Sequence, residues 1–295
     1  MNAGACRVCG SEKTVARFPA GGADLKLCRE CGVTFRTGTA SAADLAGLYD
    51  REYFLETWPG SLGRFFSAFD PARHHKTRFF SRQLSELERL VNGQRRLLDV
   101  GCANGVFVWL ARERGWEAEG LEVSPFAVEW GRKQFGVVIH EGDIHNISPE
   151  PGYDVITFWD TLEHLPDPRA ALHAAVSRLH PGGYLVILTP DTQSLVNSLV
   201  HTAYRLAPNR GRALIQRLYH TDHLCFFDRN SLAAALVAQG LQIHWIESYD
   251  EHPADTETRG LLRAGVYAVH YAASLLQRRH ELMIYARKPL KPRQP

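Results

Sequence analysis

Four cysteines near the start of the chain have the spacing of a metal site. Cys6 and Cys9 form one C-x2-C pair, and Cys28 and Cys31 form a second pair eighteen residues later. Two thiolates three residues apart can face one ion from a tight turn, and two such turns complete a tetrahedral site. Four thiolates leave no open position, so we expect a structural Zn²⁺. Two disulfides are the alternative, which a reducing location disfavours.

The stretch "LLDVGCANGVF" (97–107) has the pattern of a nucleotide-binding loop. An apolar run carries Asp99 near its end, and Gly101 and Gly105 then allow a tight turn and close approach of the backbone to a ligand. Glu122 ends the next strand-like run, where a carboxylate can accept both hydroxyls of a ribose. The loop lacks the G-x-G-x-x-G fingerprint, which disfavours a nicotinamide oxidoreductase.

Further acids follow the strand-like runs. Asp99 could meet an amino-acid moiety of the ligand, and Asp143, in "EGDI", could bond an adenine amino group. Asp160 ends the fourth run and is another candidate for contact with the ligand. A structural alternative exists for these acids, because a carboxylate at such a position can simply cap the helix that follows.

Two histidines are candidate proton acceptors. "WDTLEHL" places Glu163 and His164 after the fourth strand-like run, and "HLCFFDRNSL" places His223 before a predicted helix. Either imidazole can serve as a general base toward a hydroxyl group. Alternatively, His164 only hydrogen-bonds its own loop. Asp160, Glu163 and His164 together could also hold a divalent cation.

The elements that must position these residues alternate along the chain. Strand-like runs separated by helical stretches, such as 106–115 and 168–180, predict an α/β fold whose parallel sheet is covered on both faces. The strand-like runs are 95–101, 117–124, 137–143, 153–160, 182–190, 241–250 and 280–289.

The same pattern divides the chain into three parts. We expect a zinc ribbon over 1–40, a linker with helices over 41–94, and the α/β domain over 95–290. Two helical inserts interrupt that domain, at 193–219 and 257–279, and both combine wide apolar faces with arginines. They are expected to form a lid packed on the sheet, or alternatively a surface for an apolar substrate or a membrane interface.

Composition excludes several classes of protein. The net charge of +2 predicts no strong attraction to nucleic acid. No uncharged run approaches the roughly 18 residues of a membrane span. The first residues show no apolar segment typical of a signal peptide. We therefore expect a cytoplasmic protein, with the apolar inserts permitting peripheral contact with the inner membrane face.

Residues 95–190 resemble the class I S-adenosylmethionine-dependent methyltransferases. "LLDVGCANG" matches the D-x-G-x-x-x-G motif of that family, and "GLEVSP", "EGDI", "FWDTLEHLPDP" and "HPGGYLVILTP" resemble the blocks that follow it. The resemblance implies a Rossmann-like sheet of seven strands with the last strand antiparallel. It implies cofactor contacts by Gly101, Cys102 and Gly105 to the methionine portion, by Glu122 to the ribose, and by Ser124, Asp143 and Ile144 around the adenine.

The resemblance also implies the reaction, which is methyl transfer to a small-molecule or lipid-linked acceptor from bacterial secondary-metabolite, glycan or quinone biosynthesis. We expect O-methylation. The quinone-ring O-methyltransferases of the family carry an E-x-x-E-H cluster as a divalent-metal site, and Asp160 here replaces its first Glu. A bacterial subgroup with a four-cysteine ribbon includes sugar C-methyltransferases, so C- or N-methylation of a sugar is an alternative. A non-catalytic module that binds S-adenosylmethionine or zinc is another.

Overall fold

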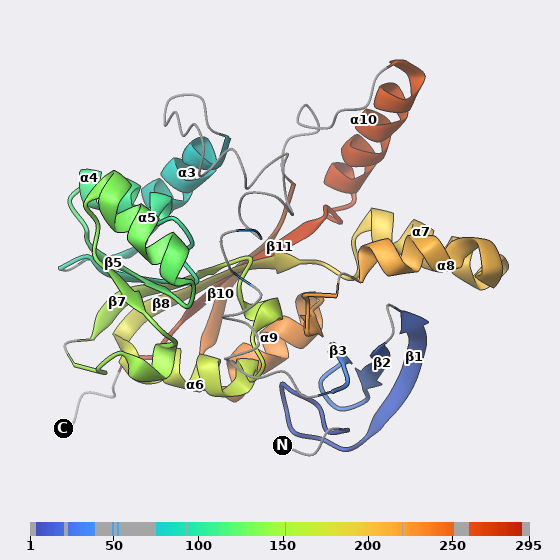
Figure 1. The fold of residues 1–295 in the computed structure, drawn as a ribbon, viewed down its shortest axis with the longest axis horizontal. Coiled ribbons are helices and arrows are strands. Elements are labelled where there is room, and N and C mark those ends of the chain that lie inside the picture. Colours follow the sequence, from blue (N-terminus) through green and yellow to red (C-terminus); the bar gives the residue numbers. More distant parts are fainter. Residues whose placement is uncertain are drawn as a thin grey trace. The chain divides into compact units, whose positions relative to one another are not determined.

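The computed structural model describes residues 4–20, 23–38, 49, 52, 75–92, 94–150, 152–219, 221–250 and 260–290 (Figure 1). The expected linker over 41–94 therefore lies, up to residue 74, almost wholly outside the described residues. The chain forms two compact units. The first comprises 1–39, 160–169 and 187–286, and the second comprises 40–159, 170–186 and 287–295.

Seven strands form the main sheet, in the order β10-β11-β8-β7-β4-β5-β6. The central strand β4 pairs in parallel with β5 and β7, and β5 pairs in parallel with β6. The last strand, β11, is antiparallel. Leu97 and Leu98 of β4 point to opposite faces and are both fully buried, as expected for a sheet covered on both sides. The α/β fold expected from the alternating pattern is confirmed. The strands are β4 (Arg96–Val100), β5 (Glu117–Glu122), β6 (Ile139–Glu141), β7 (Tyr153–Trp159), β8 (Leu179–Pro190), β10 (Gln242–Tyr249) and β11 (Glu281–Arg287).

Helices follow the strands, and their buried aromatic residues form part of the core. Phe79 and Phe80 of α3 contact Trp159 at the end of β7, and Phe80 also contacts Phe107 of α4. These contacts fix the first turn of α4, which begins directly after the glycine loop. The helices are α3 (His75–Leu90), α4 (Val106–Glu113), α5 (Pro125–Phe135) and α6 (Pro168–Arg178), with short 3₁₀ turns η2 (Ile144–Asn146) and η3 (Leu162–His164).

The N-terminal residues form a separate small sheet with the order β1-β2-β3-β9. Its strands pair in antiparallel fashion, and Thr34 and Phe35 of β3 pair with Phe226 and Cys225. The fourth strand is thus supplied from a position far along the chain. The strands are β1 (Thr14–Ala20), β2 (Ala23–Cys28), β3 (Thr34–Arg36) and β9 (Cys225–Phe226).

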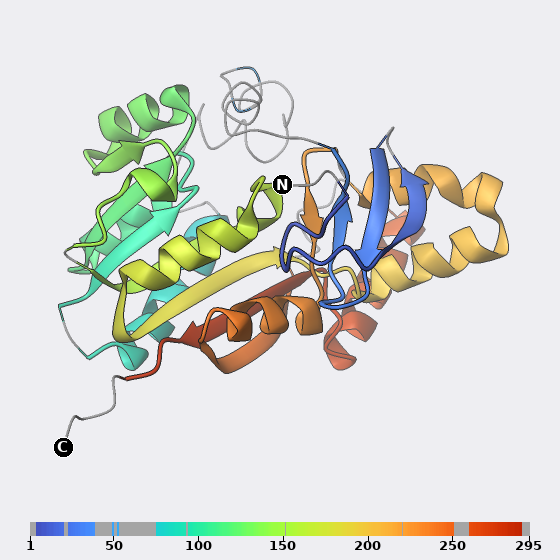
Figure 2. The ribbon, with the colours of Figure 1, turned by 90° about the horizontal axis from the view of Figure 1, so that it is seen from below.

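The two inserts are helical. The first forms the paired helices α7 and α8, which lie side by side in both views (Figures 1 and 2). Their inner faces pack on β1 of the ribbon, where Phe18 contacts Tyr204 and Tyr219, a partner that the sequence did not indicate. No helix among the described residues is long and apolar enough to cross a membrane. The helices of this unit are α7 (Leu195–Leu206), α8 (Pro208–Leu218), α9 (Arg229–Ala238) and α10 (Gly260–Leu275).

Candidate functional site

The glycine loop between β4 and α4 has a backbone that most residues adopt poorly. Gly101 and Gly105 have φ angles of 73° and 76°, in the left-handed region. A Cβ on Gly105 would lie 2.8 Å from Cδ1 of Ile139, so this position also lacks room for a side chain. Ala103 has a φ of 46°, a strained value for a residue with a Cβ. The loop is therefore held in one tight shape at the carboxyl end of β4, where open α/β sheets bind ligands.

Glu122, the last residue of β5, is tied to this loop. Its Oε2 accepts the N–H of Ala103 at 2.9 Å, and its Oε1 accepts the N–H of Ser124 at 2.9 Å. Burial raises the pKa of Glu122, while these backbone N–H groups act to lower it. Each carboxylate oxygen keeps a further lone pair, so Glu122 can accept hydroxyl groups of a ligand while it holds the loop.

Asp99 and Cys102 are buried beside the loop. The hydroxyl of Thr157 donates to Oδ1 of Asp99 at 2.7 Å. Burial raises the pKa of Asp99 to about 8, against the opposing effect of this hydrogen bond. Burial also raises the pKa of the Cys102 thiol well above its ordinary value, so Cys102 is a packing residue rather than a nucleophile.

Two glycines that sequence reasoning missed give the loop its space. A Cβ on Gly120 of β5 would overlap Sγ of Cys102, and a Cβ on Gly131 of α5 would lie 2.6 Å from the carbonyl oxygen of Asn104. The loop can approach β5 and α5 this closely only because both positions lack a side chain. The sequence alone does not show which residue packs against an isolated glycine in a strand or helix.

The residues expected around an adenine have structural roles in the fold. Oγ of Ser124 caps α5 by accepting the N–H of Ala127 at 3.4 Å, and Oδ1 of Asp143 caps η2 by accepting the N–H of His145 at 2.8 Å. Ile144 is buried. Asp143 therefore has the helix-capping role that the sequence offered as its structural alternative. Contact with an adenine remains a prediction for Ser124, Asp143 and Ile144.

Asp160 and Glu163 follow β7 in a strained turn. Asp160 has a φ of 49°, and its N–H donates to the carbonyl of Leu188 at 3.0 Å. Glu163 is 1% exposed, and neither of its carboxyl oxygens has a hydrogen-bond partner among the described residues. Burial raises the pKa of Glu163 well above its ordinary value, and the nearby charge of Asp160 raises it further. Both effects favour the neutral form of this carboxyl.

His164 and His223 meet beside this turn. Their ring centroids lie 4.5 Å apart with the rings at 86°. Nδ1 of His164 lies 3.1 Å from the carbonyl oxygen of Asp222. Because a carbonyl only accepts, Nδ1 carries a proton, and in the neutral ring the lone pair is then on Nε2. Glu163, His164 and His223 offer ligand atoms within 4.8 Å of one another, so this set could bind a proton or a divalent cation.

Residues 72–245, more than half of the chain, match a protein family described as "Methyltransferase domain". The chain belongs to this methyltransferase family. Curated proteins named "Ubiquinone biosynthesis O-methyltransferase" are similar to it. The one from Alkalilimnicola ehrlichii is 33% identical over 32% of this chain and 41% of its own length, and the one from Bordetella avium is 25% identical over 58% and 71%. The match thus spans less than half of the Alkalilimnicola protein.

Solved methyltransferase-like structures support the fold. The magnesium protoporphyrin IX methyltransferase ChlM from Synechocystis PCC 6803, solved with bound SAH, has a TM-score of 0.54 at 13% identity, and covers 81% of this chain and 97% of its own. The [4+2]-cyclase SpnF has a TM-score of 0.56 at 17% identity, covering 85% and 97%. At these identities the likeness concerns the fold alone.

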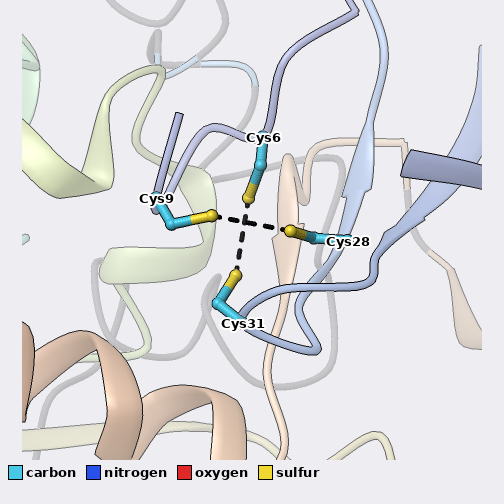
Figure 3. Close-up of side chains that lie close together, drawn as sticks. All are labelled: Cys6, Cys9, Cys28 and Cys31. Atoms are coloured by element: carbon cyan, nitrogen blue, oxygen red, sulfur yellow. Dashed lines mark hydrogen bonds between the residues drawn. The ribbon is translucent and has the colours of Figure 1, made fainter. Parts of the chain in front are cut away.

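The four N-terminal cysteines lie outside the part that matches the methyltransferase family. Figure 3 shows their sulfur atoms converging on one point, with Sγ–Sγ distances of 3.6 Å for Cys6–Cys31 and 3.5 Å for Cys9–Cys28. Tetrahedral zinc with Zn–S bonds of about 2.3 Å separates its sulfurs by about 3.8 Å. A disulfide would hold them at about 2.05 Å, and all four cysteines are free. The set fits Zn²⁺ and does not form two disulfides.

Proposed function

We propose that this methyltransferase moves the methyl group of S-adenosylmethionine to a hydroxyl oxygen of a small-molecule or lipid-linked acceptor. The observation that carries the proposal is the strained loop 101–105 with Glu122 fixed against it, at the carboxyl ends of two adjacent strands. The resemblance to ubiquinone O-methyltransferases favours an aromatic ring hydroxyl, such as that of a quinone precursor, as the acceptor group.

The position of the glycine loop indicates which residues would contact the cofactor. S-adenosylmethionine supplies an electrophilic methyl group on a sulfonium. In this proposal Glu122 accepts the ribose hydroxyls, and the buried carboxyl of Asp99 supports the loop that receives the amino-acid part. The remaining contacts are assigned to Gly101, Cys102, Gly105, Ser124, Asp143, Ile144 and Asp160. Holding the donor in one orientation is the larger contribution to such a reaction, of the order of 7–11 kcal/mol when the geometry is good.

His164 is the better candidate for general base. When bound, S-adenosylmethionine would supply the methyl group and its sulfur would keep the electron pair of the donor bond, while Nε2 of His164 would accept the proton of the acceptor hydroxyl. Glu163 is less suited to the role because it is 1% exposed, whereas the His164 side chain is 14% exposed. In the neutral ring, the contact of Nδ1 with the carbonyl of Asp222 leaves the lone pair on Nε2, where a base requires it. His223 is assigned to the acceptor side beside it. Zn²⁺ held by the four cysteines has a structural role.

The lipid-linked form of the acceptor is supported by the inserts. Residues 192–221 and 258–280 contain no aspartate or glutamate and four arginines each. Leu206 of α7 is 81% exposed and Tyr271 of α10 is 68% exposed, and α7 contacts both α8 and α10. Exposed apolar side chains beside cations are typical of helices that lie at an anionic lipid surface. We propose peripheral contact of a cytoplasmic enzyme with the inner membrane face.

Calorimetric titration with S-adenosylhomocysteine tests the cofactor half. We expect micromolar binding to the zinc-loaded protein and at least tenfold weaker binding to Glu122→Ala, with Glu129→Ala, an exposed position on α5, as the control. Binding by Glu122→Ala as tight as by Glu129→Ala would contradict the role given to Glu122. No binding by the zinc-loaded wild type would contradict the cofactor proposal and favour a non-catalytic module.

Radiolabelled methyl transfer to a panel of catechols, sugars and extracted lipids then tests the acceptor. NMR of the product distinguishes an O-methyl group from a C- or N-methyl group. Cosedimentation with vesicles containing phosphatidylglycerol tests the membrane contact, and unchanged sedimentation of a Leu206→Ser/Tyr271→Ser variant would contradict it.

A further inference from the structure

The zinc ribbon and the two histidine loops share one hydrogen-bonded framework within the first unit. Strand β9 begins two residues after His223 and completes the ribbon sheet by pairing with β3. The N–H of Arg36 donates to the carbonyl of Leu224 at 2.9 Å, and the N–H of Leu224 donates to the carbonyl of Glu163 at 2.8 Å. The ribbon, the loop of His223 and the loop of His164 are therefore connected through backbone hydrogen bonds alone.

The side chain of Arg36 adds a second connection. Its Nη2 donates to the carbonyl of Tyr219 at 3.1 Å, and its Nε lies 3.3 Å from the carbonyl of His223. Arg36 is 6% exposed, and burial lowers the pKa of its guanidinium while the charge of Asp222 opposes that effect. Buried arginine is tolerated only where its donors are satisfied. Two of its acceptors here are the carbonyls of Tyr219 and His223, so the guanidinium holds both of these residues.

Arg7 makes the corresponding connection on the other side. It lies inside the first C-x2-C turn, next to Cys6, and is 9% exposed. Its Nη1 donates to the carbonyl of Pro166 at 2.8 Å, two residues after His164, and its Nε donates to the carbonyl of Arg36 at 3.1 Å. A side chain that belongs to the cysteine turn thus reaches the loop of His164 directly.

We propose that the metal-held ribbon is the support that sets the positions of His164 and His223, with Arg36 and Arg7 as the positioning residues. The inference rests on the proposed function for the roles of the histidines, and on the geometry for the coupling. The hydrogen bond at Nδ1 of His164 is part of the same arrangement, since the carbonyl that accepts it belongs to Asp222, next to His223, whose carbonyl Arg36 contacts.

Ring ¹⁵N spectra of the full-length, zinc-loaded protein with labelled histidine test the coupling without any acceptor. His164→Gln and His223→Gln assign the two signals, and His180, which pairs with Asp154 in the other unit, is the internal reference. We expect Arg36→Met to move both ring signals and to mix the tautomers of His164. The exposed ribbon arginine in Arg29→Met is the matched control and should move neither.

Three further readouts separate positioning from unfolding and from the proposed function. Arg36→Met should keep one zinc per chain and bind S-adenosylhomocysteine within twofold of the wild type, while methyl transfer falls about 10- to 100-fold, as expected for small misplacement of a reacting group. Arg36→Lys should restore part of the ring signals, and Cys31→Ala should reproduce the Arg36→Met spectrum.

Unchanged signals of His164 and His223 in both Arg36→Met and Cys31→Ala would overturn the inference. If Arg36→Met loses its zinc, Arg7→Met is measured in its place. Provided that Arg7→Met retains its zinc, shifted signals of His164 and His223 support the inference and unchanged signals overturn it. Failure of the cofactor proposal is distinguishable from failure of this inference. In that case the wild type would not bind S-adenosylhomocysteine, whereas the ring signals of His164 and His223 would still change in Arg36→Met.

Discussion

Replacing Gly120 by alanine should damage the cofactor loop through a single methyl group. The new Cβ would overlap Sγ of Cys102 and lie 3.1 Å from its Cβ. Cys102 is buried and cannot move aside without displacing the loop. Inserting a methyl group into a packed interior costs about 1–3 kcal/mol. For a domain of this size that corresponds to a fall in Tm of about 2–12 °C.

The same overlap should weaken ligand binding, because Cys102 belongs to the loop between β4 and α4. If half of the strain falls on the loop conformation that binds, about 0.5–1.5 kcal/mol, the affinity for S-adenosylhomocysteine drops about two- to twelvefold, since about 1.4 kcal/mol is one decade. Titration calorimetry and thermal melts of the wild type and Gly120→Ala measure both effects. Gly265→Ala, at an exposed helical position where a Cβ meets nothing, is the control.

A double-mutant cycle tests the cause. Cys102→Ala removes Sγ and should recover most of the loss in Gly120→Ala, leaving only the tighter Cβ contact. Contacting residues typically show interaction energies of about 0.5–3 kcal/mol. Additive effects of the two substitutions, or a Gly120→Ala variant as stable as the wild type, would refute the assignment of the loop's shape to this contact.

Three further predictions concern charge, chemistry and metal. The pKa of Asp99 in the folded protein is raised to about 8 from an ordinary 3.8, so the folded state keeps a proton that the unfolded chain has lost, and the free energy of unfolding falls as the pH rises toward 8. Urea unfolding should show this fall between pH 5 and pH 8 for the wild type and a smaller fall for Asp99→Asn. Parallel curves would contradict the assignment. His164→Gln should lower turnover about 10²–10⁴-fold with affinity for S-adenosylhomocysteine unchanged, measured by methyl transfer and calorimetry; full activity would exclude His164 as the base. Cys31→Ser removes one of four ligands and should lower zinc content and Tm together, as checked by elemental analysis and thermal melts; one tightly held zinc in this variant would argue against the four-cysteine site.

The sequence predicted the parts of this molecule that depend on local pattern. The apolar run before Asp99 and the glycines after it place a loop at the end of β4, because the conformation of a turn depends mainly on residues adjacent in sequence. The four cysteines were brought together as their spacing indicated. Glu163 and His164, adjacent in sequence, lie close to His223 from a distant segment, a proximity that the sequence did not predict; their roles in proton transfer remain predictions.

The remaining features could not be predicted because they depend on which distant elements meet. The overlap between Gly120 and Cys102 requires the register of β5 against the loop, and one glycine among many does not reveal it. The buried arginines at 7 and 36 resemble any surface arginine in composition. Their roles arise from carbonyls more than a hundred residues away, which local periodicity cannot identify.

The pairing of β3 with β9 has a consequence for how the protein is made. The ribbon is complete in its cysteines once residue 31 has been synthesised, yet the last partner of its sheet is encoded roughly 190 residues later. At about 5–20 residues per second, the open edge of β3 waits roughly 10–40 s on the ribosome for its neighbour. Unpaired strand edges are templates for association with other chains. The edge of β3 is thus open to such association during synthesis, and a metal ion bound early by the four cysteines would not cover it.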